Sequence, residues 1–181
     1  MSKIQSGRDE NRIPLYENVP LKVPFSIALG ISDYCNFRCR YCFHSTDMGD
    51  GFKPQMLSLQ QFVDRISQIE ELLANNGLER IRILSICGAG EPLTNKQLPE
   101  MVRYIKERKI ADRIEITTNG SLLTHELSDS LIEAGLTRLL ISVQGVTEEA
   151  YKAICGYAVD MQRFLEEIRY FYKKRTNVPY I

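Results

Sequence analysis

The chain has 181 residues, of which 44% are hydrophobic and 25% are charged. This composition is ordinary for a globular domain, and it excludes a disordered chain, a collagen-like fibre and a bare coiled coil. The 23 Lys and Arg residues balance 23 Asp and Glu residues, which disfavours a protein that works by neutralising nucleic-acid phosphates.

The N-terminal residues 1–21 are predicted to form an arm, because Pro14 and Pro20 interrupt any regular pattern. They contain no apolar core of the kind that signal peptides have. No stretch of the chain approaches the roughly 20 consecutive apolar residues that cross a bilayer. We therefore expect a cytoplasmic protein without a membrane partner, whose core domain covers residues 22–181.

From residue 25 onward, apolar runs alternate with amphipathic segments. Their lengths and periodicity predict buried strands at 25–31, 81–86, 113–118 and 138–143, and the start of a fifth strand at 178–181. Helices are predicted between the strands, with N-caps at Ser58, Thr94, Thr124 and Thr147, and another helix is predicted around 164–172. Ser58 with Gln61, and Thr94 with Gln97, have the spacing of a capping box.

Strands that alternate with helices predict an α/β fold with parallel pairing and right-handed crossovers. Periodicity alone leaves two architectures open, a barrel-like sheet and an open doubly wound sheet. A complete eight-unit barrel needs about 250 residues, and this chain contains only four complete strand–helix units and the start of a fifth. Because the sequence stops inside an apparent strand, we expect the N-terminal portion of a longer protein or a cut form of one.

Three of the five cysteines lie within eight residues, directly after the first predicted strand: Cys35, Cys39 and Cys42. Ligands of parallel α/β sheets bind beyond the carboxyl ends of the strands, so this is a favourable place for a working site. Thiolates select zinc, copper(I) or iron–sulfur clusters. Structural zinc and cluster sites normally take four protein ligands, so three cysteines leave one metal position open.

Further candidate site residues follow the next three strands. Gly88, Gly90 and Glu91 follow the second strand, where glycine lets backbone approach a ligand closely and a carboxylate can receive an ammonium group. The structural alternative is a strand-to-helix turn with Glu91 near the helix N-terminus. Asn119 belongs to an Asn-Gly turn after the third strand, and Ser142 places a hydroxyl in the fourth strand, where it needs a partner if buried.

The spacing Cys35-x3-Cys39-x2-Cys42, with Tyr41 before the last cysteine, resembles the radical S-adenosylmethionine (SAM) enzymes. In that family a 4Fe-4S cluster binds SAM at its open iron and cleaves it reductively to a 5′-deoxyadenosyl radical. The later motifs also follow the family's order at successive strand ends. The resemblance implies a partial TIM-like parallel β/α barrel, and it leans toward the SPASM-type branch, whose members often have further cluster-binding cysteines in a C-terminal extension.

The resemblance also implies roles for individual residues. Besides the three cysteine ligands, the expected SAM contacts are Tyr41 near the adenine, Gly88, Gly90 and Glu91 at the methionine amino group, Asn119 near the ribose, and Ser142 at the carboxylate or ribose. Cys155 departs from the pattern, because many relatives have an Arg there that pairs with the SAM carboxylate. Cysteine cannot supply a bidentate cation, so another group must do so, with Lys152 as a candidate, or SAM binding is weaker.

These observations predict a radical SAM enzyme that abstracts hydrogen from a small-molecule or peptide substrate of unknown identity. A one-electron donor such as flavodoxin or ferredoxin is the expected partner. Two other classes stay open. One is a non-catalytic iron–sulfur protein, such as an electron carrier or a decayed family member, and the other is a zinc-stabilised binding module in which Cys87 or His44 joins the three cysteines.

Overall fold

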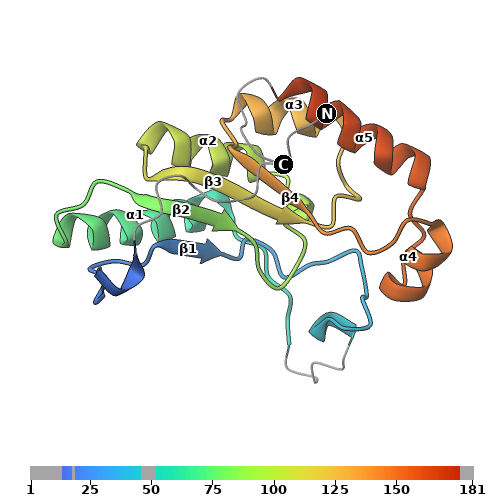
Figure 1. Ribbon diagram of the computed structural model, residues 1–181, viewed down its shortest axis with the longest axis horizontal. Coiled ribbons are helices and arrows are strands. Elements are labelled where there is room, and N and C mark those ends of the chain that lie inside the picture. The colour runs from blue at the N-terminus through green and yellow to red at the C-terminus, as the bar shows by residue number, and fades with distance from the viewer. Residues whose placement is uncertain (1–13, 18, 46–51, 176–181) are drawn as a thin grey trace.

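The fold is an α/β arrangement of four parallel strands that alternate with helices (Figure 1). The computed structural model describes residues 14–17, 19–45 and 52–175. The strands lie in the order β1-β2-β3-β4, and their bounds are β1 Ser26–Leu29, β2 Ile81–Ile86, β3 Ala111–Thr118 and β4 Arg138–Ile141. The predicted alternation and parallel pairing are thereby confirmed, and the strand predicted at 178–181 lies outside the described residues.

Within the described residues, five α-helices follow the predicted order, and their bounds are α1 Leu59–Asn75, α2 Leu98–Arg108, α3 His125–Glu133, α4 Glu148–Cys155 and α5 Met161–Lys174. Short 3-10 turns add η1 Leu15–Glu17, η2 Phe43–Ser45 and η3 Pro92–Thr94. The N-caps predicted at Ser58, Thr124 and Thr147 are confirmed, since each side chain accepts a hydrogen bond from a backbone N–H of the first turn. Ser58 and Gln61 form the complete capping box.

The capping box predicted at Thr94 is wrong. The N-cap of α2 is Gln97, whose side chain makes no capping hydrogen bond, and Thr94 is the last residue of η3. The Thr94 hydroxyl donates to the Glu91 carbonyl at 2.6 Å and lies 2.7 Å from the Ser32 hydroxyl. The threonine therefore joins two loops instead of starting a helix.

The fourth strand ends at Ile141 and not at the predicted Val143. The last register pair joins Ile141 to Thr118, the final residue of β3. One further bond, from the Ser142 backbone N–H to the Thr118 carbonyl at 2.8 Å, closes the pairing. Beyond this point β3 offers no partner, so Ser142 lies just after the strand.

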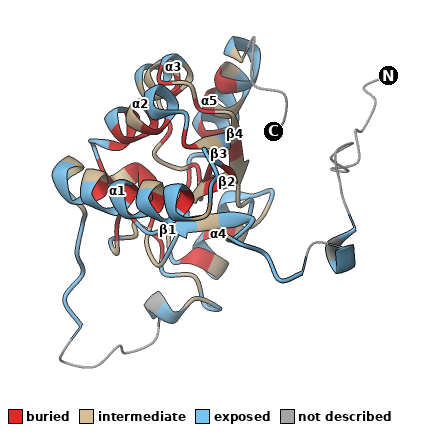
Figure 2. Cartoon of the chain, turned by 90° about the vertical axis from the view of Figure 1, so that its left-hand side faces the viewer, coloured by how far each residue is buried: buried red, intermediate tan, exposed pale blue. Residues whose placement is uncertain are grey.

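One face of the sheet packs against four helices. Contacts run from α1 to α2, from α2 to α3 and from α3 to α5, and Figures 1 and 2 show these helices on the same side of the sheet. Alternate strand residues point into this layer, because side chains of a strand alternate between its two faces. The main core on this side includes Leu84, Ile86, Ile114, Ile116 and Leu139.

The other face of the sheet has a polar row across three strands. Ser85, Glu115 and Arg138 are register partners. The Arg138 guanidinium donates to the Glu115 carboxylate at 3.0 Å. This face of the sheet therefore contains a charged pair, whereas the face that the helices cover is apolar.

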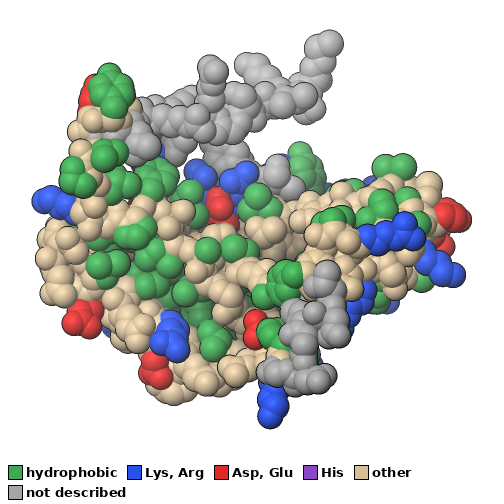
Figure 3. All heavy atoms as spheres, turned by 90° about the horizontal axis from the view of Figure 1, so that it is seen from below, with side chains coloured by type: hydrophobic (Ala, Val, Ile, Leu, Met, Phe, Trp, Pro, Cys, Tyr) green, Lys and Arg blue, Asp and Glu red, His purple; other side chains and the backbone are tan. Residues whose placement is uncertain are grey.

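None of the described helices is both long and apolar enough to span a bilayer. Figure 3 shows the protein from below the view of Figure 1, with hydrophobic side chains exposed over much of that face. Exposed aromatic residues include Tyr34, Tyr41 and Phe43, all in or beside the cysteine loop.

Candidate functional site

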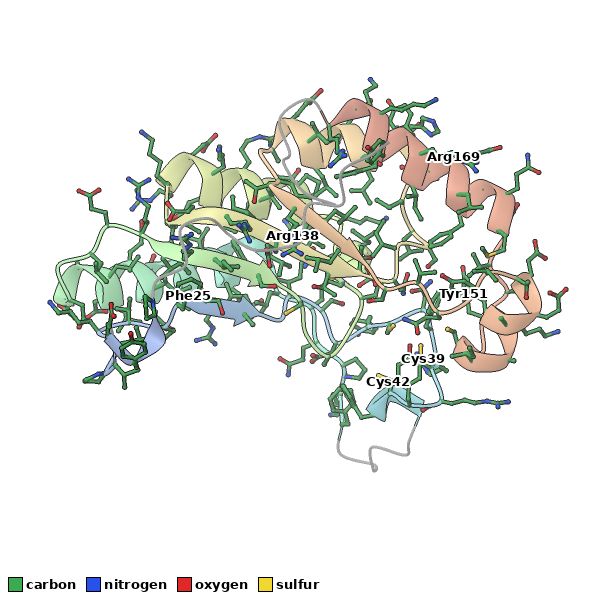
Figure 4. The ribbon with its side chains drawn as sticks, in the orientation of Figure 1. Phe25, Cys39, Cys42, Arg138, Tyr151 and Arg169 are labelled. Carbon is green, nitrogen blue, oxygen red and sulfur yellow. The ribbon has the colours of Figure 1, made fainter. Side chains whose placement is uncertain are left out.

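The cysteine loop lies at the carboxyl-terminal edge of the sheet. In Figure 4, Cys39 and Cys42 lie beyond the tips of the strands and beside α4, whereas Phe25 is at the opposite end of β1. The loops that follow β2, β3 and β4 leave the sheet at this same edge, because all four strands are parallel. The predicted site motifs therefore share one edge of the molecule.

Local hydrogen bonds shape the cysteine loop. The Cys42 backbone N–H donates to the Cys39 carbonyl at 2.9 Å. The Ser45 hydroxyl lies 2.7 Å from the carbonyls of both Cys39 and Cys42. Phe37 anchors the loop, because its ring is buried in a second core cluster, against which Cys35 and Cys39 pack. The loop is thus a defined turn that exposes part of each cysteine.

The three thiols share one electrostatic environment. Burial raises the pKa of Cys35, a hydrogen bond from the Phe37 backbone lowers it, and the negative charges of Glu91, Cys39 and Cys42 raise it again. Three thiolates beside a carboxylate repel one another unless a cation compensates them. A bound metal supplies such a charge, since metal coordination deprotonates thiols outright.

The donor set fits a cluster better than a single metal ion. A zinc ion needs its sulfur ligands about 2.3 Å from one metal centre. Among the residues that the structure describes, no three His, Cys, Asp or Glu side chains are grouped to hold one ion. A cuboidal cluster binds each cysteine to a different iron, so its ligands stand further apart. Three soft thiols on one loop suit a cluster of this kind.

Glu91 is a buried carboxylate that the protein itself holds in place. Its side chain is at the start of η3, where Oε1 accepts from the Leu93 backbone N–H at 3.0 Å and from the Thr118 hydroxyl at 2.5 Å. Oε2 accepts from the Asn119 backbone N–H at 2.7 Å. Burial raises the pKa of Glu91, and these three hydrogen bonds oppose the rise. Glu91 therefore caps the N-terminus of a helical turn, as one of the two sequence interpretations expected, but the turn is the 3-10 turn η3 and not an α-helix.

The two glycines before Glu91 are required by close backbone contacts. A Cβ at Gly88 would lie 2.8 Å from the Gly30 Cα, and a Cβ at Gly90 would collide with the carbonyls of Ser32 and Tyr34. The Gly90 backbone N–H donates to the Ser32 carbonyl at 3.0 Å. The missing side chains thus let this loop pack against the segment that precedes the cysteines. The sequence analysis had expected them to let the backbone approach a ligand.

Asn119 joins the turn after β3 to the cysteine loop. Its side-chain N–H donates to the Asn36 carbonyl oxygen at 2.9 Å, and Asn36 in turn donates to the Ser121 hydroxyl at 2.8 Å. The Asn119 Oδ1 accepts from the Ser121 backbone and hydroxyl. The expected site residue is therefore present at the site edge and is already held by protein partners.

Tyr41 reaches the loop that follows β4. Its hydroxyl donates to Oε1 of Gln144, and the Gln144 backbone N–H donates to the Tyr151 hydroxyl at 3.3 Å. Tyr151 is fully buried and makes an edge-on ring contact with Phe37. Tyr41 as a residue is 66% exposed. Its face is thus open to a planar ligand while its hydroxyl is fixed.

The remaining residues singled out in the sequence lie after β4 and on α4. Ser142 is partly buried just after β4, beside Gln144, whose side-chain N–H donates to the Ser142 carbonyl at 3.3 Å. Cys155 is fully buried, whereas Lys152 of the same helix is exposed. Burial raises the pKa of Cys155 to about 12, and its backbone carbonyl accepts a hydrogen bond from the Arg38 N–H at 2.8 Å. The residue that departs from the family pattern therefore contacts the cysteine loop.

Sequence reasoning missed three residues of this site. Asn36 lies inside the cysteine motif, and Gln144 follows β4 as the other motif residues follow their strands. Their positions in the sequence, within or directly after a motif, could have identified both as site residues. Tyr151 had no such signal, because a Tyr on an amphipathic helix is most simply a core residue.

Residues 29–180 match a family model described as the radical SAM superfamily. GTP 3′,8-cyclase of Staphylococcus carnosus is 32% identical over 148 residues, which cover 80% of this chain and 41% of that protein. The enzyme of the same name from Syntrophomonas wolfei is 32% identical over 126 residues, covering 70% and 36%. The chain thus spans about two fifths of the length of these curated relatives.

Solved structures show the same fold. Streptococcus suis SuiB bound to S-adenosylmethionine superposes with a TM-score of 0.63 at 22% identity, covering 88% of this chain and 34% of SuiB. BtrN in complex with AdoMet and 2-DOIA superposes with a TM-score of 0.55 at 21% identity, covering 80% of this chain and 55% of BtrN. The predicted partial barrel is therefore confirmed as the fold of this chain.

Proposed function

Because this chain belongs to the radical SAM superfamily, we propose that it is an enzyme in which Cys35, Cys39 and Cys42 hold a 4Fe-4S cluster and SAM binds at the iron they leave open. When bound, the cluster supplies the electron that cleaves SAM to methionine and a 5′-deoxyadenosyl radical, which abstracts hydrogen from the substrate. The electron comes from a donor such as flavodoxin or ferredoxin. The substrate is a small molecule or a peptide.

The observation that carries this proposal is the junction of the cysteine loop with the later motifs at one edge of the sheet. The loop is hydrogen-bonded to the Gly90–Glu91 segment through the Ser32 and Tyr34 carbonyls. Asn36 extends the junction to Asn119. A ligand on the cluster would therefore meet residues from three successive loops without any large movement of the chain.

Each predicted SAM contact has a distinct role in the proposal. Glu91 would receive the methionine ammonium group of SAM. Its Oε2 accepts a hydrogen bond from the Asn119 backbone N–H, and a carboxylate oxygen has a second lone pair for a further donor. Tyr41 offers its exposed ring for stacking on the adenine. Asn119 would lie near the ribose of SAM, and Ser142 would lie at its carboxylate or ribose. Gly88 and Gly90 keep this edge compact by close backbone packing.

The test is anaerobic reconstitution of the purified protein with iron and sulfide, followed by reduction and addition of SAM. The expected products are 5′-deoxyadenosine and methionine, measured by chromatography with mass detection. Cys39→Ala should lose the cluster absorbance and both products, whereas Cys87→Ala, outside the motif, should keep them. A protein that holds the cluster but makes no 5′-deoxyadenosine is an electron carrier or a decayed member. A protein isolated with zinc and without iron is a binding module.

A further inference from the structure

Three side chains from two distant segments form a closed ring of hydrogen bonds. Asn36 belongs to the cysteine loop, and Asn119 and Ser121 belong to the turn after β3. The Asn119 side-chain N–H donates to Oδ1 of Asn36 at 2.9 Å. Asn36 donates to the Ser121 hydroxyl at 2.8 Å, and that hydroxyl donates to Oδ1 of Asn119 at 2.7 Å. The ring therefore ties the cysteine loop to the turn through side chains that each donate and accept.

One backbone group fixes the direction of this ring. The Ser121 backbone N–H can only donate, and it donates to Oδ1 of Asn119 at 2.9 Å. The Asn119 amide cannot turn over without setting two donors against each other, so its N–H₂ group must face Asn36. The N–H and O–H of Ser121 also fill both lone pairs of the Asn119 Oδ1. This oxygen therefore has no lone pair left for a ribose hydroxyl.

The same turn orients the carboxylate of Glu91. The Thr118 hydroxyl donates to Oε1, and the Asn119 backbone N–H donates to Oε2. The backbone of the turn is tightly packed, because Gly120 has a φ of 74° and a Cβ there would lie 2.9 Å from the Ile141 side chain. Asn119 is thus held by its side chain on the cysteine loop and holds Glu91 with its backbone.

We propose that Asn36 is a positioning residue for SAM, which acts through Asn119 to fix the Glu91 carboxylate relative to the three cysteines. This inference rests on the proposed function, in which Glu91 receives the ammonium group of a SAM molecule bound at the cluster. A ligand that contacts the cluster and Glu91 together needs both at a fixed separation. Such preorganisation increases affinity, because less freedom is lost on binding. The Asn119 side chain then holds the turn and does not accept from the ribose.

The test measures the SAM affinity of the reconstituted protein and its variants, from the change in the cluster spectrum when SAM is added, at equal cluster content. Asn36→Ala, Ser121→Ala and Asn119→Ala should each weaken SAM binding by about fivefold, the net worth of one hydrogen bond. Because these side chains form one ring, Asn36→Ala combined with Ser121→Ala should lose little more than either change alone. If Asn36→Ala loses the cluster, the two variants outside the cysteine motif carry the comparison.

Asn76→Ala is the matched control. It removes a side-chain amide that donates to the Leu72 carbonyl at 2.8 Å, at the end of α1, and it should leave SAM affinity unchanged. Ser121→Ala with the affinity of wild type would overturn the inference. So would a loss confined to Asn119→Ala, which would indicate a direct contact of Asn119 with SAM.

Nuclear magnetic resonance of the cluster-free protein, with isotope-labelled asparagine, detects the ring without SAM. Ser121→Ala should shift the side-chain amide signals of both Asn36 and Asn119 and speed the exchange of their protons with water, while Asn76 stays unchanged. Unchanged Asn36 and Asn119 signals would overturn the inference alone. A wild-type protein that takes up no cluster, or takes it up and binds no SAM, would overturn the proposed function and this inference together.

Discussion

The Asn119 backbone N–H donates a 2.7 Å hydrogen bond to Oε2 of Glu91. Asn119 follows β3 and Glu91 follows β2, so this bond joins the ends of two neighbouring strands. The Thr118 hydroxyl adds a second bond across the same gap, at 2.5 Å to Oε1. The carboxylate therefore has a structural function in the free protein, whatever it binds when SAM is present.

Replacement of Glu91 by Gln should destabilise the protein by about 1–3 kcal/mol, because the new amide N–H₂ must face a backbone or hydroxyl donor in a buried position. Urea unfolding of the cluster-free protein measures this change. The matched control is Glu133→Gln on the exposed side of α3, which should change stability by no more than about 0.5 kcal/mol. Equal values for the two variants would contradict the account of Glu91.

The stability difference between wild type and Glu91→Gln should shrink as pH rises. Burial raises the pKa of Glu91 above its ordinary value of 4.5, so the folded state binds this proton more tightly than the unfolded state. The stabilisation that the tighter proton binding of Glu91 gives the folded state is complete below pH 4.5 and is lost as pH rises through the folded pKa. Urea unfolding of both proteins across this range gives the difference directly. A difference that grows with pH would show that hydrogen bonding to the carboxylate outweighs its burial.

Gly90→Ala should displace the segment that precedes the cysteines. The added Cβ would lie 2.5 Å from the Tyr34 carbonyl and would also collide with the Ser32 carbonyl. Overpacking of this kind costs about 1–3 kcal/mol. We expect lower stability in urea unfolding and less iron bound after reconstitution.

Gly30→Ala is the control for this variant. Its added Cβ would have the Cys87 carbonyl at 3.7 Å as nearest neighbour, which is an ordinary contact. It should leave iron binding unchanged. If Gly90→Ala also binds iron normally, the close contact with the cysteine segment does not control the site.

Thr147→Ala should weaken cluster retention, because Thr147 caps the helix that supports the cysteine loop. Its hydroxyl accepts from the Ala150 backbone N–H at 3.2 Å, and loss of such a cap costs about 1 kcal/mol. Thr124→Ala removes the equivalent cap of α3 and is the matched control. Iron release to a chelator should be faster in Thr147→Ala than in Thr124→Ala. Equal release rates in the two variants would show that the stability of α4 does not affect how the cysteine loop retains iron.

Local signals in the sequence predicted much of this fold. Helix starts at Ser58, Thr124 and Thr147 were correct because a capping side chain bonds to its own first turn. The strand at Ile81–Ile86 was correct because a short run rich in Ile and Leu, of strand length, favours a buried strand. The cysteine motif was visible because its ligands are neighbours in the chain. The capping box predicted at Thr94 was wrong because its hydroxyl hydrogen-bonds to Ser32 in a different loop.

The sequence by itself determined the order of strands and helices and the loop that offers three thiols, because propensity, capping and ligand spacing act over a few residues. Only the tertiary structure decided which loops touch. The bonds from Asn119 to Asn36 and from Tyr41 to Gln144 join segments far apart in the chain, as does the bond from the Arg38 N–H to the Cys155 carbonyl. Such contacts depend on strand register and on how α4 packs, and no local pattern encodes either one.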